Sequence, residues 1–78
     1  MKPRWYRGRF TLKVDTIPEP FIDNHEHHVI SDDPRDAVQR IRTLAEAAVD
    51  GWFELGVNRD EIERSKIEIT DMGQAEDA

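Results

Sequence analysis

The chain has 78 residues, no cysteine and a formal net charge of −6. A chain of this size folds as one small domain, and the lack of cysteine excludes a disulfide framework, a thiolate zinc site and a catalytic thiol. The acidic balance disfavours general nucleic-acid binding, and the absence of an apolar run of ~20 residues or of a signal peptide leads us to expect a soluble, cytoplasmic protein without membrane contact.

Apolar and basic side chains alternate over residues 6–14. This period of two predicts a first strand with one buried face and one solvated, basic face. Arginines interleaved with aromatic residues are also typical of sheets that stack single-stranded bases, so a nucleic-acid interface on this strand is an alternative function. Its residues would be Trp5, Arg7, Arg9 and Lys13.

Pro18 and Pro20 interrupt the next stretch and predict a long connection, with Ile17, Phe21 and Ile22 tucked against the body. A short second strand is predicted over residues 27–31.

All three histidines, His25, His27 and His28, lie around the start of this second strand, and we interpret them as part of a solvated turn. His25 and His27 would reach one metal ion together with a carboxylate only if the backbone bends, and no cysteine or further histidine completes the ligand set. We therefore predict no metal and no cofactor, and keep His25 and His27 as a weak alternative metal site. A third interpretation is a proton-responsive regulator, because the neighbouring acids would favour the charged histidines.

Strong local signals predict a helix over residues 34–55. Asp33 is a typical N-cap, Pro34 suits the first helical position, and Asp36 adds an acid to the first turn. Apolar residues then recur with helical period as far as Leu55, and Gly56 follows as a natural stop. Such a helix would be about 33 Å long, enough to cover a small sheet.

The outward face of this helix carries Glu46, Asp50 and Glu54, spaced four apart. Like charges at this spacing repel each other, and the helix dipole disfavours anions in the C-terminal half, so stability does not explain the pattern. We interpret the face either as a solubilising surface or as a ridge of free carboxylates, extended by Glu61, Glu63 and Glu68, that docks on a basic partner.

A third strand is predicted over residues 66–72, followed by a disordered tail at 73–78. Residues 1–72 then form one α+β domain of the ββαβ type: a two-layer fold with a three-stranded antiparallel sheet in the order 2-1-3, covered on one face by one long helix. Strands two and three are edges, which leaves self-association through strand pairing open.

The sequence has no phosphate-binding loop, nucleophile elbow or dinucleotide fingerprint, and we expect no catalytic residues and no enzyme activity. In size, charge and layout it resembles the small accessory proteins of bacteriophages, including inhibitors that occupy nucleic-acid-binding surfaces of host defence complexes. The resemblance implies a viral accessory or inhibitor protein acting in the host cytoplasm. We therefore expect a small acidic interaction module that docks Glu46, Asp50, Glu54 and Glu61 on a basic surface, such as that of a nucleic-acid-binding protein.

Overall fold

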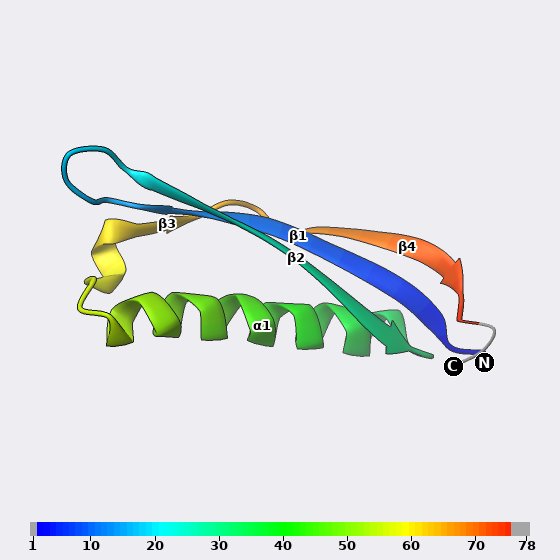
Figure 1. The fold of residues 1–78 in the computed structure, drawn as a ribbon. Helices are drawn as coiled ribbons and strands as arrows, with labels where there is room; N and C mark the ends of the chain where they lie inside the picture. Colours follow the sequence, from blue (N-terminus) through cyan, green and yellow to red (C-terminus); the bar gives the residue numbers. More distant parts are fainter. Residues whose placement is uncertain (1, 76–78) are drawn as a thin grey trace.

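A computed structural model describes residues 2–75 as an α+β domain in which an antiparallel sheet lies against one long helix (Figure 1). The elements are β1 (Arg4–Val14), β2 (Phe21–Ser31), α1 (Pro34–Glu54), the 3-10 helix η1 (Arg59–Glu61), β3 (Ile62–Arg64) and β4 (Glu68–Gln74). The molecule is elongated, with principal dimensions of 48 × 19 × 18 Å. Within residues 2–75, no helix combines the length and the apolar composition that crossing a membrane requires.

The predicted strand order is confirmed, with β1 in the centre. On one side β2 pairs with β1 from Arg4↔Ser31 to Val14↔Phe21 without interruption. On the other side β3 and β4 follow one another along β1; β4 corresponds to the predicted third strand, and β3 is an additional short strand that was not predicted. Ser65 bridges the break between β3 and β4, because its N–H donates to Thr11 O and its hydroxyl accepts from Thr11 N–H, both at 2.9 Å.

The second strand is longer than the sequence predicts. It begins at Phe21 rather than residue 27, because the turn is confined to residues 15–20 and the next residues pair in register with β1. Gly8 lies opposite His27 and Phe10 opposite His25, so both histidines belong to the sheet. The interpretation of the histidine cluster as a solvated turn is therefore wrong.

The ordered chain also reaches beyond residue 72. β4 extends to Gln74, and the buried Ala75 donates its N–H to Pro3 O at 3.1 Å. The remainder of the predicted tail, residues 76–78, lies outside the described residues.

The core forms between α1 and one face of β1, as the alternation predicts. β1 contributes Tyr6, Phe10, Leu12 and Val14, and the helix contributes Ala37, Ile41 and Ala45. The two layers are in close contact at Gly8, where an added Cβ would overlap the Ile41 side chain. Asp33 caps the helix by accepting the Arg35 N–H at 2.9 Å, and α1 continues unbroken through Gly51.

Candidate functional site

The three predicted carboxylates, Glu46, Asp50 and Glu54, are all exposed along α1. Asp50 is not free, however, because it forms an ion pair with Arg59 of η1 at 2.6 Å. The Arg59 guanidinium also lies over the Phe53 ring, 4.7 Å from its centroid. Glu46 and Glu54 have no ion-pair partner anywhere in residues 2–75. The predicted ridge of free carboxylates is therefore reduced to these two on α1.

The β1–β2 turn, the C-terminal end of α1, η1 and β3 lie at one end of the long axis (Figure 1), and because these segments are rich in carboxylates we call it the acidic end. The β1–β2 turn meets the later elements there: Asp15 N–H donates to Glu61 O at 2.9 Å, and the Phe21 and Trp52 ring centroids are 5.4 Å apart. The acidic end comprises residues 13–23 and 46–64, with nine acids, three bases and a net charge of −6. The rest of residues 2–75 carries six acids and eight bases, a net charge of +2.

The nine acids of this end come from five parts of the fold: the β1–β2 turn, β2, α1, η1 and β3. They are Asp15, Glu19, Asp23, Glu46, Asp50, Glu54, Asp60, Glu61 and Glu63. Glu61, which the sequence predicts as a partner-binding residue, is exposed on η1.

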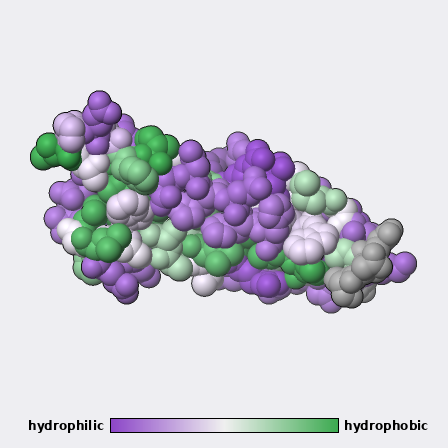
Figure 2. All heavy atoms as spheres, in the orientation of Figure 1, coloured by the Kyte–Doolittle hydropathy of each residue, from purple (hydrophilic) through white to green (hydrophobic). Residues whose placement is uncertain are grey.

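Exposed apolar side chains share the acidic end. The Ile17 side chain is 98% exposed and Leu55 77% exposed, and Phe21, Ile22 and Phe53 are each about half exposed. Figure 2 shows hydrophobic groups at this end of the molecule, set among hydrophilic ones. The expectation that Ile17, Phe21 and Ile22 are tucked against the body is wrong for Ile17, whereas Phe21 and Ile22 are only half covered and Phe21 packs against Trp52.

His25 and His27 lie on the helix-facing side of β2, where they pack as part of the sheet. Their rings stack with centroids 5.6 Å apart, and the Phe10 ring stacks on both, at 4.8 Å from His25 and 5.7 Å from His27. His25 Nε2 donates to Asp23 Oδ2 at 2.8 Å, and Trp52 Nε1 donates to the same oxygen at 2.8 Å. Asp23 therefore ties the strand to the last turns of α1.

The environment shifts the pKa values of two groups in this cluster. Burial raises the pKa of Asp23, but the hydrogen bonds from Trp52 and His25 outweigh it and leave that pKa below its usual value. Burial lowers the pKa of His27, and the charges of His25 and His28 lower it further. The expectation that neighbouring acids favour the charged form is therefore wrong for His27.

The histidine pair does not assemble a metal site with other groups. Across residues 2–75, no set of three or more histidine and carboxylate side chains is placed to hold one ion. His27 Nε2 is buried and has no hydrogen-bond partner within the described chain, while His25 Nε2 is occupied by Asp23.

The predicted basic row, Trp5, Arg7, Arg9 and Lys13, lies on the face of β1 that points away from α1. Arg9 Nε donates to Glu26 Oε1 at 2.7 Å, and this hydrogen bond holds the pKa of Glu26 below its usual value. Arg7 Nε is buried without a partner among residues 2–75. Trp5 remains 39% exposed, with its ring edge-on to His28. The Glu26 carboxylate, paired with Arg9, therefore interrupts the basic row.

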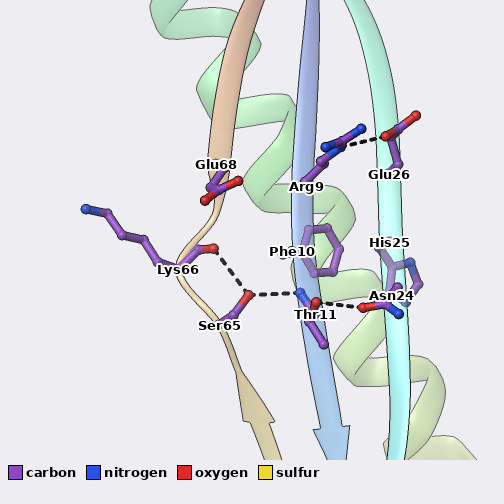
Figure 3. A pocket seen from close by; sticks show the side chains of 9 residues that line it. All are labelled: Arg9, Phe10, Thr11, Asn24, His25, Glu26, Ser65, Lys66 and Glu68. Carbon is purple, nitrogen blue, oxygen red and sulfur yellow. Dashed lines mark hydrogen bonds and ion pairs between the residues drawn. The ribbon is translucent and has the colours of Figure 1, made fainter.

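A polar hollow of about 560 Å³ opens between β2, β1 and the β3–β4 break (Figure 3). Its polar groups largely bind each other: Arg9 pairs with Glu26, and the Thr11 hydroxyl donates to Asn24 Oδ1 at 2.8 Å. The Ser65 hydroxyl donates to Lys66 O at 3.2 Å rather than to the His25, Glu26 or Glu68 side chains that also line the hollow.

Comparisons with family models, curated proteins and solved structures found no match. Function is therefore inferred from the surfaces of the molecule alone.

Proposed function

We propose that the protein is a small, non-catalytic interaction module whose acidic end binds a basic surface of a partner protein. The observation that carries this proposal is the segregation of charge, with −6 at the acidic end and +2 over the rest of residues 2–75. Such an arrangement orients an approaching cationic partner and increases the rate of encounter more than the final affinity.

The exposed apolar groups supply a second contribution to binding. Phe21, Phe53 and Leu55 lie at the same end as Glu54, whose carboxylate is free. Protein interfaces commonly combine a few apolar anchors with a polar or charged rim. The Arg59–Phe53 contact holds one of these rings in place before binding.

A finer proposal follows from size, charge and layout. We propose an accessory or inhibitor protein of the bacteriophage type, acting in the host cytoplasm on a protein whose basic surface otherwise binds nucleic acid. Occupying that surface with carboxylates would exclude phosphate groups from it.

Direct nucleic-acid binding by the outer face of β1 is the second candidate. The exposed indole of Trp5 on the same face as Arg7 favours it, and the Arg9–Glu26 pair weighs against it. Loss of single-stranded oligonucleotide binding in Trp5→Ala would support this alternative.

The main proposal is tested by reversing charge at the acidic end. In Glu46→Lys/Glu54→Lys we expect normal folding and loss of the partner that the wild-type protein captures from a lysate of its source organism. The matched control, Asp32→Lys/Glu68→Lys, makes the same change in net charge outside the acidic end and should retain the partner. Undiminished capture by the first variant would contradict the proposal.

A further inference from the structure

The two edges of the sheet differ in how they are protected. The edge formed by β3 and β4 consists of strands of three and seven residues, separated by a break and carrying a register shift opposite Trp5/Tyr6. Short strands and bulges are common means of preventing an edge from pairing with another chain. The β2 edge has eleven residues, no register shift and no proline.

The hydrogen-bonding direction of β2 follows from contacts on the far side of β1. Thr11 O accepts from Ser65 N–H, so Thr11 and the other odd-numbered residues of β1 point their backbone groups towards β3 and β4. Even-numbered residues such as Phe10 therefore bond to β2, where Phe10 lies opposite His25. Consequently, the odd-numbered residues of β2 face β1 and the even-numbered residues face outwards.

These outward-facing groups are largely unused. At one end of the edge, Arg40 Nη1 donates to Ile30 O at 2.7 Å. This hydrogen bond agrees with an outward-pointing Ile30 carbonyl, and the arginine covers the edge at that position. The even-numbered positions Ile22, Asn24, Glu26 and His28 have no backbone hydrogen-bond partner within residues 2–75. The open stretch, residues 22–28, is about 20 Å long.

The open stretch itself, residues 22–28, carries two acids, Asp23 and Glu26, and no lysine or arginine. The chain from Val14 to Pro34 contains no lysine or arginine and six acids. Those acids are Asp15, Glu19, Asp23, Glu26, Asp32 and Asp33. Lysine is a frequent guard of exposed edge strands, and β2 has none. A strand that adds here would meet the carboxylates of Asp23 and Glu26, the second of which is already paired with Arg9.

We propose that the open edge of β2, residues 22–28, accepts an extended basic segment of a partner protein by strand addition. In this mode, backbone hydrogen bonds supply affinity, and alternating side chains supply specificity. Lysine or arginine of the added strand would lie beside Glu26 on the outer face and beside Asp23 towards the helix. The inference that the partner segment is positively charged rests on the proposed function, whereas the observation that the β2 edge is open does not.

The test uses a short, end-blocked peptide of alternating lysine and valine as the probe. In amide hydrogen exchange, we expect this peptide to protect the N–H groups of Asn24, Glu26 and His28. A glutamate–valine peptide should give no protection.

Two variants at one position separate backbone from side chain. Glu26→Ala and Glu26→Pro both remove the carboxylate and its pairing with Arg9, but only proline removes the outward N–H and places a ring on the edge. We expect Glu26→Ala to bind the peptide within about threefold of wild type and Glu26→Pro to bind it at least about tenfold more weakly. Protected amides at His25 and His27 in both variants would show that the β1–β2 ladder is intact. If proline disturbs the β1–β2 ladder, the proposal is judged by which amides the peptide protects in the wild-type protein.

Three results would overturn the proposal. One is equal binding by Glu26→Ala and Glu26→Pro with an intact ladder. Another is peptide protection of α1 amides around Glu46 and Glu54 instead of β2, which would leave the acidic-end function standing. The third is dimerisation of the free protein that protects the same β2 amides, because a second copy would then occupy the edge. Partner capture by Glu46→Lys/Glu54→Lys tests the proposed function without altering the edge.

Discussion

Asp23 shows how a single carboxylate joins two layers of this fold. One of its oxygens accepts hydrogen bonds from His25 on the same strand and from Trp52 near the end of α1. In the extended β2 strand Asp23, His25 and His27 lie on one side, whereas the sequence was interpreted as a solvated turn over these residues. The sequence does not reveal Trp52 as the partner, since that residue lies 29 positions away. The long-range hydrogen bond from the Trp52 indole to Asp23 therefore appears only in the folded structure.

His27 should make stability depend on pH. The folded state holds this histidine neutral, with a pKa below the ordinary value of 6.5, so the unfolded chain takes up the proton first as pH falls. We expect the free energy of unfolding, measured by urea titration, to decrease between about pH 7.5 and about pH 5. Asp23 does not contribute in this range, because its lowered pKa keeps it ionised.

His27→Leu provides the comparison, since leucine fills similar space and does not titrate. The slope of stability against pH should become smaller in this variant. Identical slopes for the two proteins would show that His27 has no part in the effect.

At the scale of elements, the parts specified by local signals were predicted well. The cap at Asp33, Pro34 in the first turn and the apolar stripe place α1 to within one residue at its C-terminal end, and alternation fixes the inner face of β1. The early start of β2 and the short strand β3 were missed, because both depend on pairing with β1 rather than on local composition. The polar character of residues 21–26 suits an edge strand as well as a loop.

Alanine substitutions at Gly51 and Gly8 test the stability of α1 and its packing against the sheet. Gly51→Ala should stabilise the protein by about 1 kcal/mol, because Gly51 lies in the helix with open space around its Cα. Gly8→Ala should destabilise it by about 1–3 kcal/mol, because the new methyl group would displace Ile41 from the core. Urea unfolding of both variants measures the difference. Equal effects would argue against a close approach of the layers at Gly8.

At the scale of the whole molecule, the main feature is charge separation along a 48 Å axis. Composition gives the net charge, but the polarity arises only because the β1–β2 turn folds beside the end of α1 and η1. The sequence identified Glu46, Glu54 and Glu61 as exposed acids, and it missed the acids of the turn and the apolar groups beside them. Those residues are distant in the chain, and only the hairpin brings them together.

The acidic end should make binding sensitive to ionic strength. Salt screens charges over about 10 Å at 0.1 M and about 3 Å at 1 M, so the association rate with a basic partner should fall steeply across this range while dissociation changes less. Stopped-flow or surface-based kinetics would measure both rates. Glu46→Lys/Glu54→Lys should show a flatter salt dependence than Asp32→Lys/Glu68→Lys. A rate independent of salt would point to purely apolar contact.

The hydrogen bond between Ala75 and Pro3 has a practical consequence for such measurements. It brings both ends of the described chain together at the pole opposite the β1–β2 turn (Figure 1). A fluorophore, affinity handle or sensor-chip linkage attached before Pro3 or after Ala75 would therefore sit nearly the full length of the molecule away from the turn. Immobilisation through either terminus should leave that far pole accessible to incoming proteins.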